Sequence, residues 1–228
     1  MILCMRRKGE QRKSFSISYI LANGKSNIGV QRGRLTMTEN DRYVKTVRTL
    51  AISGSLRSNS SNTSLLKAAM TLASNNHRIV IFEGIGDLPH FNPDIEGDDS
   101  ITSVRDFRVQ LQNSDAVIIS SPEYAHGVPG VLKNALDWVV GSGELVAKPV
   151  ALFNASPRST YAQASLLETL TVMSAKIVKE AFVTVELAGK KLDEAGMVSD
   201  LEISKALKSA LAALETAIQN QTRMTIEG

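Results

Sequence analysis

The chain has 228 residues, 43% of them hydrophobic, which is enough for one α/β domain with a sizeable core and some additional segments. Its single cysteine, Cys4, excludes a disulfide framework or a cysteine-rich metal site within one chain, and its three histidines show no metal-ligand spacing. The apolar runs are far too short to span a membrane, so we expect a soluble protein of a reducing compartment, the cytoplasm.

The net charge of +3 is distributed unevenly along the chain. Residues 1–45 hold 10 Lys and Arg against 3 Asp and Glu, a net charge of +7, whereas residues 46–228 hold 16 against 20, a net charge of −4. We therefore predict a basic N-terminal extension, 1–45, and one folded domain, 46–222. The folded part gives no electrostatic support for nucleic-acid binding.

Three interpretations of the extension are open. Its Arg- and Ser-rich, acid-poor composition is typical of an organelle transit peptide. Its charge would also suit an arm that binds nucleic acid or an anionic surface. We favour a disordered leader, or a start codon assigned too early with Met37 as the true first residue, because no regular amphipathic face is visible.

From Thr46 onward, short apolar runs alternate with helical patterns. The predicted strands are 47–52, 78–82, 116–119, 150–153 and 178–185. The predicted helices are 65–73, 100–113, 131–140, about 161–173, and a C-terminal helix with apolar positions Ile203, Leu207, Ala210, Leu211, Leu214 and Ile218. This alternation predicts a three-layer, doubly wound α/β sandwich of flavodoxin type, with a five-stranded parallel sheet in the order 2-1-3-4-5.

Ligands of open α/β sheets bind beyond the carboxyl ends of the strands, so the loops there are the candidate site. The loop 53–63, after the first strand, offers six hydroxyl side chains, the guanidinium of Arg57 and the start of a helix. These groups suit an anion such as phosphate, although N-capping of the helix is the alternative role for the hydroxyls. Neither GxxxxGK[ST] nor GxGxxG is present, so nothing indicates a nucleoside triphosphate or a Rossmann dinucleotide site.

The loop 120–130, after the third strand, has the composition of a rigid ligand-binding turn. Pro122 and Pro129 stiffen its backbone, and Gly127 and Gly130 would allow a flat ligand to approach closely. Tyr124 offers a ring for stacking and a hydroxyl for hydrogen bonding.

Two other residues of this loop have simpler alternative roles. Glu123 would serve as a helix-dipole or surface residue, and His126 would be exposed to solvent. A Ser-His hydrolase is disfavoured, because GxSxG is absent and no acid is placed to orient His126.

Three motifs in order make the chain resemble the NADPH-dependent FMN reductase family, whose flavodoxin-like members include bacterial FMN, quinone, azo-dye and chromate reductases. The motifs are Gly54-Ser55-Leu56-Arg57 with Ser60-x-Asn62-Thr63, Leu88-Pro89-x-Phe91-Asn92-Pro93-Asp94, and Ser121-Pro122-Glu123-Tyr124 with Gly127-x-Pro129-Gly130-Val131-Leu132-Lys133-Asn134-Ala135-Leu136-Asp137-Trp138. The resemblance spans residues 46 to about 220, and the third motif is the most specific of the three.

The resemblance implies that three groups of residues bind FMN. The group around the phosphate is Ser55, Arg57, Asn62 and Thr63, with Ser60 close by. The group along the isoalloxazine ring, acting largely through the backbone, is Pro122, Glu123 and Tyr124, with Gly127 keeping the loop close to the ring. The group in the loop after the fourth strand is Asn154, Ala155, Ser156 and Arg158.

In this last loop the chain departs from the family, because residues 157–161 stand where many relatives carry glycines. The bulkier loop alters the contacts expected on the pyrimidine side of the flavin and the approach of the nicotinamide. Arg158 is a candidate to assist the 2′-phosphate of NADPH instead.

The resemblance implies an NAD(P)H-dependent FMN reductase that passes a hydride from NADPH or NADH to bound FMN, and electrons on to a flavin, quinone, azo or metal-oxyanion acceptor. The cofactor carries this chemistry, so no catalytic side chain and no metal is expected. The first alternative is a flavodoxin-like one-electron carrier, although such carriers are usually acidic and more aromatic than this chain, at 5%. The second is a non-catalytic binding module.

The helix 131–140 predicts oligomerisation. Its apolar residues, including the only tryptophan, Trp138, cover more of its circumference than one sheet face buries. We therefore expect a subunit interface in a homodimer or homotetramer. The alternative is burial under the adjacent loop 141–148.

Overall fold

The computed structural model describes residues 46–97, 101–187 and 192–227. The predicted extension, 1–45, and the proposed start at Met37 lie outside the described residues. Within those ranges, no helix has both the length and the apolar character needed to cross a membrane.

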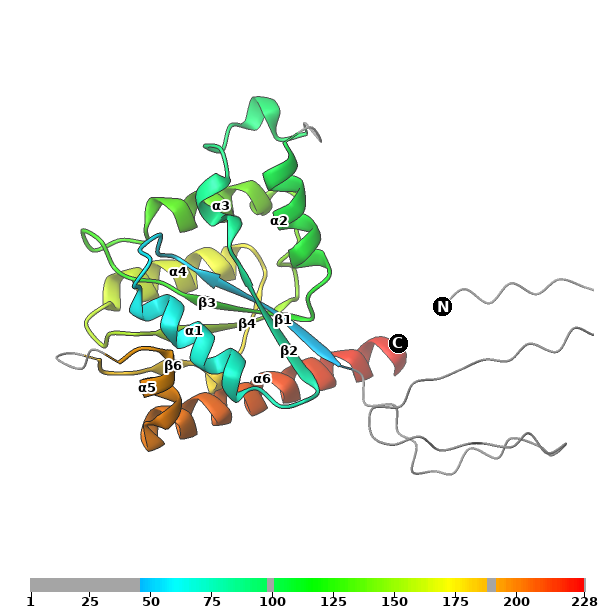
Figure 1. The fold of residues 1–228 in the computed structure, drawn as a ribbon. Coiled ribbons are helices and arrows are strands. Elements are labelled where there is room, and N and C mark those ends of the chain that lie inside the picture. The colour runs from blue at the N-terminus through cyan, green and yellow to red at the C-terminus, as the bar shows by residue number, and fades with distance from the viewer. Residues whose placement is uncertain (1–45, 98–100, 188–191, 228) are drawn as a thin grey trace, which may run out of the picture. The chain divides into compact units, whose positions relative to one another are not determined.

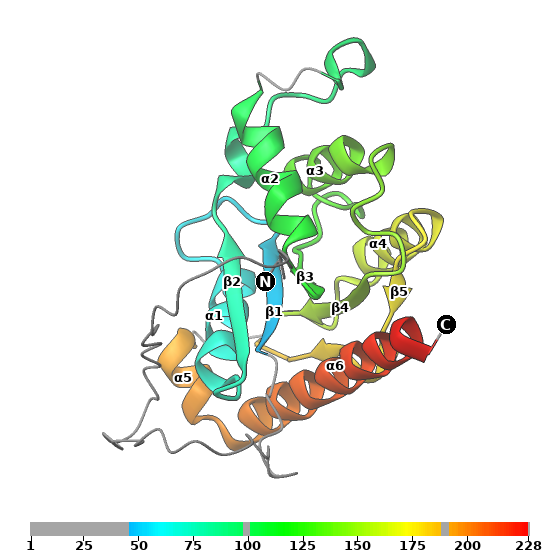
Figure 2. The same cartoon turned by 90° about the vertical axis from the view of Figure 1, so that its right-hand side faces the viewer.

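A parallel sheet forms the centre of the fold (Figure 1). Its strand order, β2-β1-β3-β4-β5, confirms the predicted flavodoxin-like order (Figure 2). Its strands are β1 (Val47–Ser53), β2 (His77–Phe82), β3 (Ala116–Ser120), β4 (Pro149–Asn154), β5 (Lys176–Ile177) and β6 (Val183–Thr184). The apolar runs of β1, β3 and β4 are buried on both faces, as parallel strands between helices require.

The prediction of one continuous fifth strand, 178–185, is wrong. Two short strands, β5 and β6, both pair with β4, and a 3₁₀ turn at Lys179–Ala181 separates them. Val150 of β4 pairs with Ile177, and Phe153 of β4 pairs with Val183. The segment from 177 to 183 therefore has more residues than the segment of β4 that it runs beside. The surplus residues cannot stay in the ladder, so they form the turn.

Helices cover both faces of the sheet (Figure 2). The side chains of β3 pack alternately against the two helix layers. Ala116 and Ile118 of β3 face one layer, whereas Val117 and Ile119 face the other, as the two-residue period of a strand demands. The first layer holds α1 (Ser61–Leu72), α5 (Glu194–Ser199) and α6 (Leu201–Glu227). The second holds α2 (Thr102–Gln112), α3 (Gly130–Val140) and α4 (Thr160–Val172).

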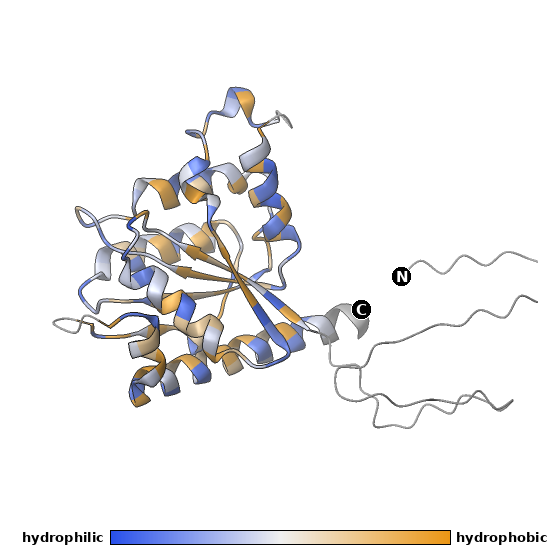
Figure 3. Ribbon diagram, in the orientation of Figure 1, coloured by the Kyte–Doolittle hydropathy of each residue, from blue (hydrophilic) through white to orange (hydrophobic). Residues whose placement is uncertain are grey.

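The C-terminal helix confirms its predicted face, because all six of its predicted apolar residues are buried against α1 and the sheet. Hydrophobic residues are concentrated on the central strands, whereas each helix carries both hydrophobic and hydrophilic residues along its length (Figure 3). The short helix α5 was not predicted from the sequence. Its N-cap is Asp193, whose carboxylate accepts a hydrogen bond from Gly196 N.

Trp138 does not contribute to a subunit interface, contrary to our expectation, because its side chain is fully buried within the chain. Its Nε1 donates to Pro89 O at 2.7 Å, and its ring packs edge-on against Phe91. Asn134 fixes the covering loop, accepting from Phe91 N and donating to Pro89 O. The cover is therefore mainly the long loop after β2, not 141–148, although Leu145 joins the same apolar cluster.

His77, at the start of β2, is buried and connects three elements. Its Nε2 lies 2.7 Å from Thr49 Oγ1 on β1, and its Nδ1 lies 2.9 Å from Glu215 Oε1 on α6. Burial lowers the pKa of His77, and this outweighs the opposing effects of Glu215 and, more distantly, Asp115. The imidazole therefore favours its neutral form in the folded protein.

We predict that His77 makes the protein less stable as the pH falls below 6.5, the ordinary pKa of histidine. The unfolded chain binds this proton first, so the free energy of unfolding decreases as the pH falls from 6.5 towards the lowered folded pKa. The slope from this group is at most about 1.4 kcal/mol per pH unit. Urea unfolding at pH values on either side of 6.5 measures it.

His77→Gln should lose less stability than the wild type over the same interval. His90→Gln, which changes an exposed histidine, should behave like the wild type. Equal losses in the wild type and His77→Gln would contradict the prediction.

Candidate functional site

The loop after β1 is shaped by its own hydroxyl groups. Ser60 is the N-cap of α1 and accepts a hydrogen bond from Thr63 N, which confirms the capping role considered from the sequence. Ser53 Oγ lies 2.8 Å from Thr63 Oγ1 and accepts from Ser55 N. Ser55 Oγ in turn accepts from Arg57 N at 3.3 Å. The loop is therefore folded tightly around the N-terminus of α1, and Arg57 lies exposed at its rim.

The loops after β1 and β3 lie against each other. Gly54 N donates to Ser120 O at 2.8 Å, and Ser120 Oγ donates to Asn62 Oδ1 at 2.9 Å. A Cβ atom on Gly54 would lie only 2.8 Å from Ser121 Oγ, so this approach requires glycine. The segment predicted to bind phosphate and the Pro-Glu-Tyr segment therefore meet at one edge of the sheet.

The central loop contains a strained turn. Tyr124 and Gly127 exchange two backbone hydrogen bonds, Tyr124 N to Gly127 O and Gly127 N to Tyr124 O. Ala125 and His126 between them have φ angles of 50° and 58°, the left-handed values of a type I′ turn. Such angles cost a residue with a Cβ atom about 1–2 kcal/mol. The special backbone of this loop therefore lies at Ala125 and His126, whereas a Cβ on Gly127 would make only an ordinary contact.

The central loop also contacts the start of α4. Glu123 Oε2 accepts a hydrogen bond from Ala162 N at 2.8 Å, in the first turn of α4, where a carboxylate is favourable beside the helix dipole. The ring of His126 stacks on that of Tyr161, with centroids 4.2 Å apart and planes at 16°. Glu123 therefore has the helix-dipole role considered from the sequence, and the loops after β3 and β4 are joined.

The loop after β4 is ordered by its own polar groups. Asn154 Oδ1 accepts from Ser156 N at 3.0 Å, and Ser156 Oγ accepts from Arg158 N at 3.3 Å. Arg158 is exposed at the surface of this loop. The loop therefore reaches α4 in a fixed conformation without glycine.

A hollow of about 340 Å³ lies between the first and central loops. Its lining is mostly apolar with one guanidinium, and consists of Gly54, Leu56, Arg57, Tyr124, Pro129, Gly130 and Val131. Tyr124 and Leu56 are largely exposed at its mouth. A volume of this size, with few polar groups, suits part of a small flat ligand.

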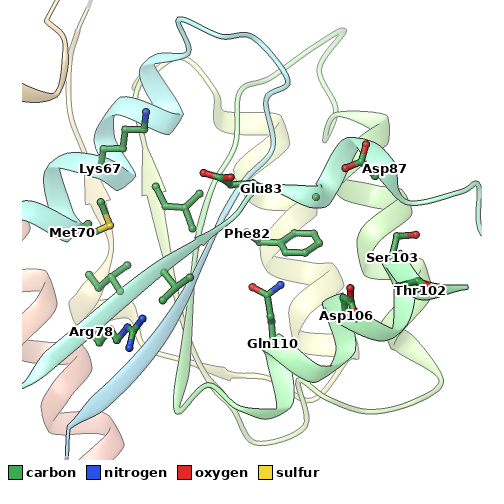
Figure 4. Close-up of a pocket in the computed structure, with 14 residues that line it drawn as sticks. Lys67, Met70, Arg78, Phe82, Glu83, Asp87, Thr102, Ser103, Asp106 and Gln110 are labelled. Atoms are coloured by element: carbon green, nitrogen blue, oxygen red, sulfur yellow. The ribbon is translucent and has the colours of Figure 1, made fainter. Parts of the chain in front are cut away.

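Two other hollows lie outside the space between the first and central loops. One of about 810 Å³ follows β2, between Lys67 and Met70 of α1 and Asp106 and Gln110 of α2 (Figure 4). It contains none of the residues predicted to form the site. A larger one, of about 1130 Å³, separates the outer side of the first loop from α5 and shares Arg57 with the site.

The structure thus brings the three predicted groups to the carboxyl ends of β1, β3 and β4, which are adjacent in the sheet. The groups are Ser55, Arg57, Ser60, Asn62 and Thr63; Pro122, Glu123, Tyr124 and Gly127; and Asn154, Ser156 and Arg158. Ser120 and Ala125 lie in the predicted loop 120–130 but, like Tyr161, were not among the predicted site residues. Tyr161 stood at the boundary between the bulky segment 157–161 and the expected helix and was given no role, and no local pattern marks Ala125 as left-handed.

Comparison with known proteins gives matches along most of the folded part. The family model described as NADPH-dependent FMN reductase matches residues 47–190. The chain is 34% identical over 182 residues to a rice (Oryza sativa subsp. japonica) protein named probable NADPH:quinone oxidoreductase 2, covering 75% of this chain and 88% of that one. It is 31% identical over 174 residues to an NAD(P)H-dependent FMN reductase of Pseudomonas aeruginosa, covering 74% and 94%.

A solved structure is also similar. The flavoenzyme NAD(P)H:(acceptor) oxidoreductase FerB of Paracoccus denitrificans superposes with a TM-score of 0.68 at 29% identity. The superposition covers 76% of this chain and 98% of FerB. The similarity in structure therefore extends over nearly the whole of that flavoenzyme.

We predict that Ala125→Gly raises the free energy of unfolding by about 0.5–1 kcal/mol. Glycine escapes the cost of the left-handed backbone, and this gain exceeds its larger loss of chain entropy on folding. The urea midpoint measures the change. Ala195→Gly is the matched control, because Ala195 is exposed on α5 and should lose about 1 kcal/mol. A decrease in both variants would contradict the prediction.

Proposed function

Because the chain belongs to the NADPH-dependent FMN reductase family, we propose that this NAD(P)H-dependent flavin oxidoreductase passes its electrons to a quinone. The family match and the relatives named as oxidoreductases establish the enzyme class and the cofactors, FMN and NAD(P)H. The observation that supports the assignment of the site is the convergence of the first and central loops on one hollow.

We assign the FMN phosphate to the loop after β1. The N-terminus of α1 presents backbone N–H groups and the positive end of the helix dipole. The exposed guanidinium of Arg57 is able to pair with two phosphate oxygens. Asn62 also holds Ser120, and Ser60 caps the helix, so these two residues keep the loop in shape as well.

We assign the flavin ring to the hollow between Pro129 and the exposed Tyr124, with Arg57 towards the phosphate end. Its apolar lining suits a flat aromatic ring. When bound, FMN supplies the redox chemistry by accepting a hydride from NAD(P)H and releasing electrons to the acceptor. The side chains of the chain therefore hold and orient the ring and limit its contact with water, and none of them needs to act as a nucleophile.

The choice of a quinone rests on the names of the relatives, which include NADPH:quinone oxidoreductases and quinone reductases. A flavin, an azo dye and a metal oxyanion are the other acceptors that the expected chemistry allows. A one-electron carrier is disfavoured because the family consists of reductases.

We also propose a homodimer or homotetramer in the cytoplasm. The support for the oligomer comes from three exposed side chains: Val140 and Val172, the last residues of α3 and α4, and Val146 in the loop after α3. Ala147 N donates to Ser174 O, which keeps the segments of Val146 and Val172 together. A monomer in light scattering at micromolar concentration would contradict this proposal.

We predict that the purified protein carries FMN and that anaerobic NADPH bleaches its visible flavin absorption. Arg57→Ala should weaken FMN binding about tenfold, because a charge-assisted hydrogen bond to the phosphate is lost at an exposed position. Titration of flavin-free protein with FMN measures the dissociation constant.

Arg105→Ala, which changes an exposed arginine on α2, should leave that constant unchanged. A colourless wild-type protein that takes up no added FMN would contradict the proposed function. Equal affinities in the wild type and Arg57→Ala would contradict only the assignment of the phosphate.

We propose that Arg158 recognises the 2′-phosphate of NADPH. Arg158 is exposed on the loop after β4, the strand next to β3 in the sheet, and a guanidinium is able to pair with phosphate. Arg158→Ala should reduce the preference for NADPH over NADH about tenfold, because the two donors differ only in that phosphate. The ratio of kcat/KM values measures this preference, and an unchanged ratio would contradict the role.

A further inference from the structure

The turn Tyr124–Gly127 needs support from outside itself. Ala125 and His126 both carry side chains and both have left-handed φ angles. Residues with a Cβ atom disfavour this conformation, so the two reciprocal hydrogen bonds of the turn compete with relaxation to right-handed angles. A contact that favours the left-handed form would keep the turn in one conformation.

Two such contacts end on the first turn of α4. His126 stacks on Tyr161 with ring centroids 4.2 Å apart and planes at 16°, a nearly parallel arrangement. On the residue just before the turn, Glu123 Oε2 accepts from Ala162 N at 2.8 Å. The turn is therefore joined to α4 in two places, at its centre through the ring of Tyr161 and just before its start through the carboxylate of Glu123.

The start of α4 is itself fixed to the sheet. Asn154, the last residue of β4, accepts from Ser156 N, and Ser159 N donates to Ser156 O at 3.1 Å. These bonds define the path from β4 to Tyr161. A continuous set of contacts therefore runs from β4, through Tyr161 and His126, to the strained turn.

The stack contributes little to the core. Tyr161 is 58% exposed and His126 is exposed as well, so the pair removes little apolar surface from water. A contact of this kind changes the orientation of the turn more than the stability of the fold.

We infer that Tyr161 is a positioning residue for the flavin, which it affects through His126 without touching the cofactor. The stack keeps residues 122–124 in the conformation that binds the ring, before the cofactor arrives. Without Tyr161 the turn populates other conformations, and FMN binding must restore the left-handed one at the expense of affinity. This inference rests on the proposed FMN site.

The test uses flavin-free full-length protein and the quenching of FMN fluorescence on binding. Tyr161→Ala should raise the FMN dissociation constant about three- to tenfold, the equivalent of losing one aromatic pair. Tyr161→Phe keeps the ring and should stay within about twofold of the wild type. Leu201→Ala, which changes an exposed side chain at the start of α6, is the control and should leave the constant unchanged.

A second substitution tests the role of backbone strain. Adding Ala125→Gly to Tyr161→Ala removes part of the cost of the left-handed turn, because glycine adopts such angles freely. The double variant should recover at least about twofold in FMN affinity over Tyr161→Ala alone. Failure to recover would overturn the account.

A readout without flavin separates this inference from the proposed function. In flavin-free protein, the ring current of Tyr161 should shift the His126 ring protons upfield in the NMR spectrum, and Tyr161→Ala should abolish the shift. His126→Gln identifies the signals. Absence of the shift in the wild type would overturn the inference even if FMN binds.

The two ideas fail in different ways. If the wild type shows the shift and binds FMN, but Tyr161→Ala binds FMN equally tightly, the positioning role is overturned and the proposed function stands. If the wild type shows the shift but binds no FMN, the proposed function is overturned, and the positioning role falls with it.

Discussion

The site depends on the parallel pairing of β1 with β3, which sets Ser53 beside Ser120. This register brings Gly54 N to Ser120 O and Ser120 Oγ to Asn62, so that two loops separated by more than fifty residues share one edge. Because a parallel ladder aligns the carboxyl ends of its strands, the loops that follow them must lie together. Glycine at position 54 lets the two loops approach this closely, because a Cβ atom there would lie too near Ser121.

Polar groups at this edge mostly bind one another. The hydroxyls of Ser53, Ser55 and Ser60 shape the first loop, and the carboxylate of Glu123 faces the start of α4. The guanidinium-bearing Arg57 and the exposed ring of Tyr124 are left to line the hollow. A site in which the cofactor supplies the reactivity needs this kind of preorganisation more than it needs a reactive side chain.

The length of the loop after β2 has a structural role, because it covers Trp138 and is fastened by Asn134. The same motif that made the chain resemble a flavin reductase family thus includes residues that build the core beside the site. This is why the apolar surplus of α3 gave a wrong expectation for Trp138: helical periodicity shows which residues avoid water, but not which segment covers them.

The sequence by itself determined the strand order, the three candidate loops and the family, because apolar periodicity and the motif from Ser121 to Trp138 are local properties of the chain. It also determined the buried face of α6. Only the tertiary structure decided that the fifth strand is interrupted at Lys179–Ala181, since that depends on how many residues β4 can pair with. The left-handed angles of Ala125 and His126 and the stack on Tyr161 are likewise visible only in the folded chain, because the stack joins two loops far apart in sequence.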